Sequence, residues 1–253
     1  MSAPELDLSI QQNASGSRPD DSPKASRYAQ HQCTKVMRYF DGAYFSINHA
    51  RGGRFCRAFA PMFRRGANSI HLRCVELLAG ASVASVLDLG CGTGELLEQL
   101  GDRGVASGTG VDSSRRSLAL ASARLQGRDG FRFETADLRR CRALHELHDA
   151  VLCIGVFDYY SLERQFLERL FACAKEFVAI TVPARIVTPR RLLRLAWLAA
   201  QGIRLHAHSR DSLEKLAERA TTRGWSIEVD CPPKQDNLWL VGRRQQRPTM
   251  ASS

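Results

Sequence analysis

One glycine-rich turn constrains the fold of this 253-residue chain more than any other stretch of its sequence, and it reads Asp88-Leu89-Gly90-Cys91-Gly92-Thr93-Gly94. The residues before it, 85–90, form a short apolar run that predicts a buried strand, and residues 95–100 have the pattern of a helix. Glycine lets a backbone turn tightly and lets a ligand approach without a clash with Cβ. The sequence therefore predicts a strand, a close-approach turn and a helix.

Strand and helix patterns alternate through the middle of the chain. We predict strands at residues 85–90, 106–111, 131–134, 150–154 and 177–182, with helices at 95–100, 117–125 and 166–174. This alternation indicates an α/β fold of the Rossmann-like, doubly wound kind, with a parallel sheet and helices on both faces. The chain then changes pattern: a helix at 213–223 stopped by Gly224 precedes two strands, 225–229 and 237–241, which we expect to pair antiparallel.

Composition divides the rest of the chain. An apolar content of 44% supports one sizeable core. We predict a disordered tail at 1–26, an N-terminal helical cap at 27–80, a main domain at 81–245 with a substrate-cap insertion at 184–210, and a tail at 246–253. The sequence has no stretch of about 20 apolar residues that would span a membrane and no secretory leader pattern. Eight scattered cysteines suggest buried thiols and a cytoplasmic protein.

Three acids are expected at the same edge of the sheet. Asp88 closes the first strand, Asp112 ends the second, 18 residues after Gly94, and Asp137 follows the third. An acid at the end of the second strand can accept hydrogen bonds from ribose hydroxyls. The glycine spacing is G-x-G-x-G, whereas a nicotinamide dinucleotide site has G-x-G-x-x-G. A plain turn at the glycines, a dinucleotide site, and Asp137 as a helix N-cap remain as alternatives.

Together these motifs resemble the class I S-adenosylmethionine-dependent methyltransferases, over about residues 80–245. The resemblance implies a seven-stranded sheet with only the last strand antiparallel, and S-adenosyl-L-methionine as cofactor. It implies that Asp88 and the Gly90 backbone meet the amino-acid end of the cofactor, that Asp112 binds the ribose, and that Asp137 with Leu138 frames the adenine. The cofactor-binding residues that we predict are Asp88, Gly90, Cys91, Gly92, Gly94, Asp112, Ser113, Asp137, Leu138, Ile154, Gly155 and Tyr39. Cys91 has no expected chemical role.

The fourth motif of the family is the stretch Ile154-Gly155-Val156-Phe157-Asp158. It lacks the N/D-P-P-Y/F pattern of the enzymes that methylate nucleic-acid bases. It looks like the small-molecule members of the family and is similar to the magnesium-protoporphyrin and quinone-pathway methyltransferases. We therefore expect an enzyme that methylates a small molecule in biosynthesis, on oxygen, nitrogen or carbon.

Positive charge gathers where the family builds its acceptor pocket. Residues 31–80 hold eight Lys and Arg against two Asp and Glu, and residues 184–210 hold six against none. This favours an anionic or lipophilic acceptor, an acceptor carried by an acidic protein, or docking on an anionic membrane surface, although solvated arginines on an ordinary helix would look the same. We expect a monomer or homodimer and no specific nucleic acid.

For the chemistry we predict Asp158, Tyr159 and His206 as the catalytic residues. His49, His208 and Tyr160 are further candidates for a general base, and Tyr39 or Tyr44 for a cap over the cofactor. His206 and His208 alternate and would point the same way from an extended segment, but without a third ligand we predict no metal site. An RNA or protein methyltransferase, favoured by the net charge of +10, and a non-catalytic partner subunit that docks through 51–65, remain alternatives.

Overall fold

The computed structural model describes residues 69–185, 206–221, 224–232 and 236–245, together with 192, 196, 198–200, 202 and 203. A helix over residues 69–78 comes first. The elements that follow are β1 (Ser85–Leu89), α4 (Glu95–Gly101), β2 (Ser107–Asp112), α5 (Arg115–Arg124), β3 (Phe131–Thr135), the 3₁₀ helix η2 (Arg142–His145), β4 (His148–Cys153), α6 (Arg164–Ala172), β5 (Ala174–Pro183), α8 (Arg210–Ala220), β6 (Trp225–Asp230) and β7 (Asn237–Arg244). The predicted tails, most of the predicted cap and much of the predicted insertion lie outside the described residues.

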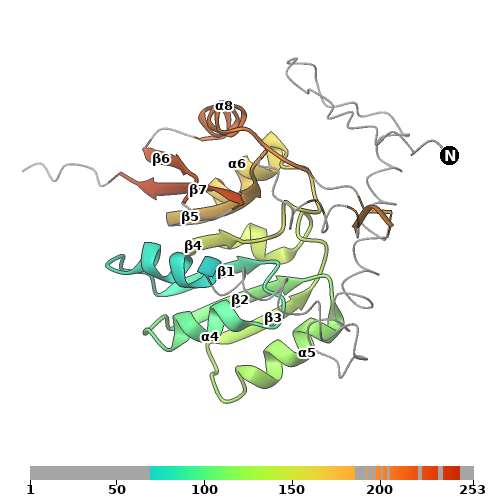
Figure 1. The fold of residues 1–253 in the computed structure, drawn as a ribbon. Coiled ribbons are helices and arrows are strands. Elements are labelled where there is room, and N and C mark those ends of the chain that lie inside the picture. Colours follow the sequence, from blue (N-terminus) through green and yellow to red (C-terminus); the bar gives the residue numbers. More distant parts are fainter. Residues whose placement is uncertain are drawn as a thin grey trace, which may run out of the picture.

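The seven strands form one sheet in the order β3-β2-β1-β4-β5-β7-β6 (Figure 1). β1 pairs in parallel with β2 and β4, and the outer pairs β2–β3 and β4–β5 are also parallel. β7 runs antiparallel to both of its neighbours, β5 and β6. The predicted fold class is therefore confirmed. The strand order reverses between β1 and β4, and in open α/β sheets ligands bind at the carboxyl ends of the strands at such a reversal.

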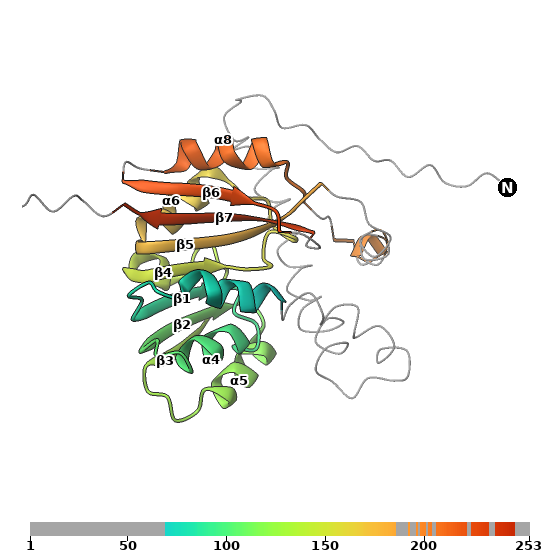
Figure 2. The same ribbon diagram turned by 60° about the vertical axis from the view of Figure 1, so that its left-hand side comes forward.

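Two apolar layers pack the helices on opposite faces of the sheet. The helix at 69–78, α4 and α5 share one cluster, built around Leu97 and Leu118, while α6 and α8 share the other, around Leu167 and Leu213. The short connection 79–84 joins the first helix to β1, so the first turn of this helix lies near the carboxyl end of β1 (Figure 2). The sheet edge where β1 and β4 end is therefore flanked by helices from both layers.

Several helix ends differ from the sequence prediction by one to three residues, and two of them have a clear physical cause. The helix expected at 166–174 ends at Ala172, and β5 begins at Ala174, where it already pairs with His148. Long-range pairing thus extends the strand backward over polar residues whose side chains are exposed. The helix expected at 213–223 begins at Arg210 instead, because the Ser209 hydroxyl accepts a hydrogen bond from the Ser212 amide and caps its start.

Glycines in β2 serve the packing of β3. A Cβ atom at Gly108 would lie 2.7 Å from the Phe131 ring, and one at Gly110 would lie 2.7 Å from the Phe133 ring. The absence of side chains at Gly108 and Gly110 lets the two aromatic rings of the neighbouring strand approach the backbone of β2 closely. Glycine has a low propensity for strands, but it is required at these two positions because the aromatic rings approach the backbone so closely.

The thiols that the structure describes are free, and five of the six are buried: Cys74, Cys91, Cys141, Cys153 and Cys173. This confirms the predicted buried thiols for that part of the chain. None of the described helices has the length and apolar character needed to cross a bilayer.

Candidate functional site

Apart from His206, the predicted site residues that the structure describes lie at or just after the ends of four strands, on the same side of the sheet. The glycine turn follows β1, Asp112 and Ser113 end β2, Asp137 and Leu138 follow β3, and the fourth motif follows β4. These four strands are neighbours and parallel, so their carboxyl ends meet at one edge. Of the predicted residues, Tyr39 lies outside the described part of the chain, as do the further candidates Tyr44 and His49.

The turn after β1 is built from glycines with left-handed backbone. Gly90, at φ 83°, donates its amide hydrogen to the carbonyl of Val111 at 2.7 Å, and a Cβ there would lie 2.3 Å from Val156 Cγ2. Gly92, at φ 54°, differs, because no atom of the described residues lies within 4 Å of the position of its Cβ. One glycine is therefore required by the protein's own packing, and the other faces open space.

Asp112 ties this turn to the end of β2. Its Oδ2 accepts the Gly92 amide hydrogen at 3.0 Å, and its Oδ1 accepts that of Ser114 at 2.8 Å. Ser114 in turn caps α5, since its hydroxyl accepts the Ser117 amide hydrogen at 3.1 Å. The acid predicted to bind ribose thus also holds the turn and the start of α5 in register.

Asp88 is the buried acid of the site, with 2% of its surface exposed. Burial and the negative charge of Asp112 raise the pKa of Asp88 to about 7. Burial also raises the pKa of the neighbouring Cys91 thiol well above its usual value. Cys91 is therefore a packing residue rather than a nucleophile, because a thiol reacts as its thiolate. Its Sγ lies 2.8 Å from the position of a Cβ on Gly110.

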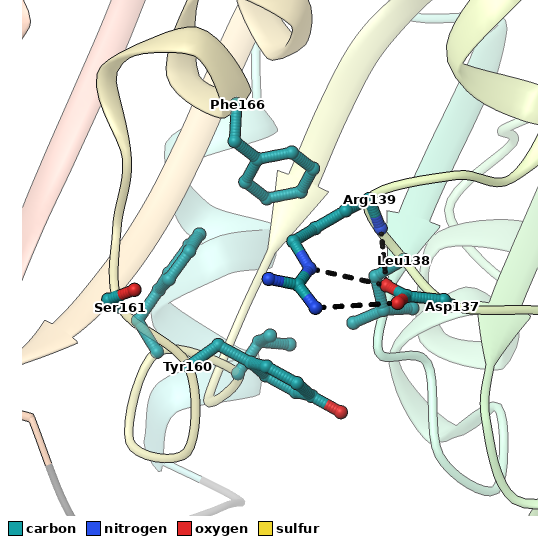
Figure 3. Close-up of a pocket in the computed structure, with 8 residues that line it drawn as sticks. Asp137, Leu138, Arg139, Tyr160, Ser161 and Phe166 are labelled. Atoms are coloured by element: carbon teal, nitrogen blue, oxygen red, sulfur yellow. Dashed lines mark hydrogen bonds and ion pairs between the residues drawn. The ribbon is translucent and has the colours of Figure 1, made fainter. Parts of the chain in front are cut away.

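Asp137 and its neighbours line a small pocket beside the ends of β3 and β4 (Figure 3). The Asp137 carboxylate accepts hydrogen bonds from the backbone amide of Arg139 at 3.0 Å and from its guanidinium at 3.4 Å. These contacts hold the pKa of Asp137 below its usual value despite partial burial. The Arg139 guanidinium also lies 5.7 Å from the centre of the Tyr160 ring. No α-helix begins at Asp137, so the alternative that Asp137 caps a helix is wrong. Its carboxylate instead stabilises a local turn.

The loop after β4 forms the opposite wall. The Gly155 amide donates to Thr181 Oγ1 at 2.8 Å, which fixes the loop to β5. Val156 packs over Gly90, as described above, and Phe157 meets Phe166 edge to face at 5.9 Å between ring centres. Asp158 and Tyr159 are both buried.

The end of the predicted insertion returns to this loop. The His206 amide donates to the Asp158 carbonyl at 3.3 Å, and the His208 amide donates to the Pro183 carbonyl at 2.8 Å. Burial, with smaller contributions from His206 and Arg185, lowers the pKa of His208 to about 4, and its buried Nε2 has no hydrogen-bond partner among the residues that the structure describes. The structure thus brings His206 and His208 close to the predicted residues Asp158 and Tyr159.

Arg124 is a site residue that the sequence alone did not indicate. From the last turn of α5 its Nε donates to the Thr93 carbonyl at 2.9 Å, and its terminal nitrogens meet Glu98 at 2.7 Å and Glu95 at 3.4 Å. Arg124 therefore joins the glycine turn to the first turns of α4. An arginine on an amphipathic helix carries no local signal for such a role.

The geometry fits S-adenosylmethionine. The open space above Gly92 admits a ligand at the switch point of the sheet, and the acids Asp88 and Asp112 stand on either side of the turn. The small pocket of Figure 3 combines apolar walls with the polar edge of Asp137.

Comparison with known proteins agrees with this geometry. Residues 86–177 match the sequence model of a family described as "Methyltransferase domain". The chain is 28% identical over 139 residues to the malonyl-[acyl-carrier protein] O-methyltransferase of Bacillus cereus, a match that covers 54% of this chain and 48% of that protein. The chain thus spans about half the length of this curated relative.

Two solved structures share the fold. The magnesium protoporphyrin IX methyltransferase of Synechocystis PCC 6803 with bound SAH aligns with a TM-score of 0.61 at 19% identity, over 84% of this chain and 100% of that one. The plantazolicin methyltransferase in complex with SAH aligns with a TM-score of 0.56 at 15% identity, over 87% and 99%. At such low sequence identities, these alignments show a shared fold and nothing more.

Proposed function

We propose that this chain, whose residues 86–177 match a family described as "Methyltransferase domain", is a class I S-adenosylmethionine-dependent methyltransferase that transfers a methyl group to a small anionic acceptor. The observation that carries the proposal is the open glycine turn at the switch point, with Asp88, Asp112 and Asp137 at three adjacent strand ends. In the reaction the carbon–sulfur bond of the cofactor breaks, a bond from the methyl carbon to the acceptor atom forms, and S-adenosylhomocysteine leaves.

Residues at three strand ends would hold the cofactor. The Gly90 and Gly92 backbone with Asp88 would receive its amino-acid end, Asp112 its ribose, and Asp137 with Leu138 its adenine. The bound cofactor supplies an electrophilic methyl group on a sulfonium. The work of the protein is then to bring the acceptor in line and to exclude water.

On the acceptor side we propose Asp158, Tyr159 and His206. The two buried residues of the β4–α6 loop and the returning segment at 206–208 are joined by the hydrogen bond from His206 to the Asp158 carbonyl, which supports a shared pocket. A carboxylate acceptor is already ionised at neutral pH and would attack without a base. For a hydroxyl acceptor, His206 would take up the proton.

The proposed acceptor is a carboxylate, either free or attached to an acidic carrier protein in the cytoplasm. The match to a malonyl-carrier-protein methyltransferase and the basic composition of 31–80 and 184–210 both support this class. Buried free thiols support a reducing compartment.

The test is methyl transfer by the purified full chain with S-adenosylmethionine. The acceptors are malonyl-[acyl-carrier protein], the same carrier protein without the malonyl group, and magnesium protoporphyrin IX. We expect S-adenosylhomocysteine to form with malonyl-[acyl-carrier protein] only, with mass spectrometry detecting one added methyl group on the malonyl carboxylate.

Asp112→Ala is the variant that links turnover to the site, and we expect it to lose S-adenosylhomocysteine binding. A protein that binds S-adenosylhomocysteine but methylates none of these acceptors would contradict the proposed acceptor and leave the cofactor site standing. A protein that binds no cofactor and turns over no acceptor would favour the non-catalytic partner instead.

A further inference from the structure

His71 is a partly buried histidine of the helix at 69–78, and the methyltransferase domain match, which starts at residue 86, gives it no role. Two electrostatic influences indicate its position. Cys74, one helical turn further along, lies close enough to Asp88 that the carboxylate adds to the effect of burial and raises the pKa of the thiol. His71 itself lies within the field of Glu95, the first residue of α4. The helix at 69–78 thus presents His71 where the glycine turn passes into α4.

The imidazole of His71 lacks a partner on one side. Its Nδ1 atom is buried and makes no hydrogen bond within the described structure. Burial lowers the pKa of His71, and the opposing influence of Glu95 is smaller, so the ring is neutral at pH 7. Leaving a buried polar nitrogen unpaired is unfavourable, and such a group in a native fold calls for an explanation, such as a bound ligand.

The charges around His71 select the kind of partner. Glu95 and Asp88 are both acids, and a carboxylate ligand would meet their repulsion. A neutral imidazole with its proton on Nε2 offers the lone pair of Nδ1 as an acceptor. A cationic N–H donor satisfies Nδ1 and the two acids at once.

We propose that Nδ1 of His71 accepts a hydrogen bond from the α-ammonium group of S-adenosylmethionine, with Glu95 supplying the countercharge. This rests on the proposed site for the amino-acid end of the cofactor at the glycine turn. His71 is then a binding residue that lies outside the matched domain, and it recognises the charged amine of the ligand.

The experiment compares three ligands by titration calorimetry: S-adenosylhomocysteine, its deaminated analogue that keeps the carboxylate, and 5′-methylthioadenosine, which lacks the amino-acid part. We expect His71→Ala to weaken S-adenosylhomocysteine binding about tenfold, because a hydrogen bond to a charged group is lost. The affinities for the other two ligands should stay within about twofold. His71→Asn, which places a carbonyl oxygen near the position of Nδ1, should restore most of the loss.

His145→Ala is the matched control, since His145 is exposed and precedes β4 at the opposite edge of the sheet. It should change none of the three affinities. An equal loss for all three ligands in His71→Ala would assign His71 a structural role and overturn the proposal, as would unchanged binding of S-adenosylhomocysteine. If the unsubstituted chain bound none of the three ligands, the proposed cofactor site itself would be wrong. That result differs from an equal loss of affinity for all three ligands in His71→Ala, which concerns only the role of His71.

Discussion

At the scale of single residues, a substitution at Gly92 should reduce the affinity for the ligand much more than it reduces the stability of the fold. Its φ of 54° costs an alanine about 1–2 kcal/mol, but in the described part of the chain no atom lies within 4 Å of the new Cβ. The methyl group would instead occupy the space proposed for the cofactor. We expect Gly92→Ala to lower the melting temperature by a few degrees and to weaken S-adenosylhomocysteine binding by tenfold or more, measured by thermal unfolding and calorimetry.

Gly104→Ala supplies the comparison for this prediction. Gly104 has a φ of 94° and equally open surroundings, but it lies in the turn after α4, at the other edge of the sheet. It should show a similar loss of stability with unchanged affinity. Equal affinities for the two variants would mean that no ligand approaches Gly92.

Asp88 makes stability depend on pH. Its pKa is raised to about 7 in the fold, chiefly by burial, from 3.8 for an unperturbed carboxyl. The folded state therefore holds a proton that the unfolded state has lost, so this contribution is complete below about pH 4 and is lost as the pH rises through 7. Relative to Asp88→Asn, we expect the native chain to lose about 2–4 kcal/mol between pH 4 and pH 8, measured by urea unfolding. A difference in unfolding free energy that stays constant with pH would show that Asp88 ionises normally.

At the scale of elements, Arg124 holds two helices to the glycine turn. Its hydrogen bonds to the Thr93 carbonyl and to Glu98 join α5 to the turn and to α4. We expect Arg124→Met to destabilise the chain by about 1–2 kcal/mol and to weaken S-adenosylhomocysteine binding, because the turn loses a fixed position. Arg128→Met is the control: Arg128 pairs with Asp102 at an exposed site, and such pairs contribute about 0–1 kcal/mol. Equal effects of both substitutions would contradict the role of Arg124.

The elements also show why the sequence was informative about some features and silent on others. The acids Asp88, Asp112 and Asp137 could be placed together because parallel strands bring their carboxyl ends to one edge. The close packing of Val156 on Gly90 and of Phe133 on Gly110 could not, because it depends on the register of neighbouring strands. The same holds for His71 and Arg124, whose helical patterns give the face they present but not the partner they meet.

At the scale of the whole molecule, the first described helix is fastened to the last strands of the sheet. Arg73 forms an ion pair with Asp230 of β6 at 2.7 Å, and its guanidinium lies 5.5 Å from the centre of the fully buried Trp239 ring of β7. These contacts join residues more than 150 positions apart. The position of His71 over the glycine turn therefore depends on the opposite end of the domain.

Arg73→Met tests this connection, since it keeps much of the apolar stem and removes the charge. We expect a loss of about 1 kcal/mol in the free energy of unfolding, because both the ion pair and the stacking on Trp239 are lost. Amide hydrogen exchange should become faster in residues 69–78 than in α8, and S-adenosylhomocysteine binding should weaken because His71 shares the loosened helix. Lys215→Met, which removes an exposed pair with Asp211, should leave both measurements unchanged. A double-mutant cycle that combines Arg73→Met with Asp230→Asn measures the coupling free energy of this ion pair. If that coupling were zero, the helix would be held by its apolar face alone. The affinity for the ligand would then not depend on Arg73.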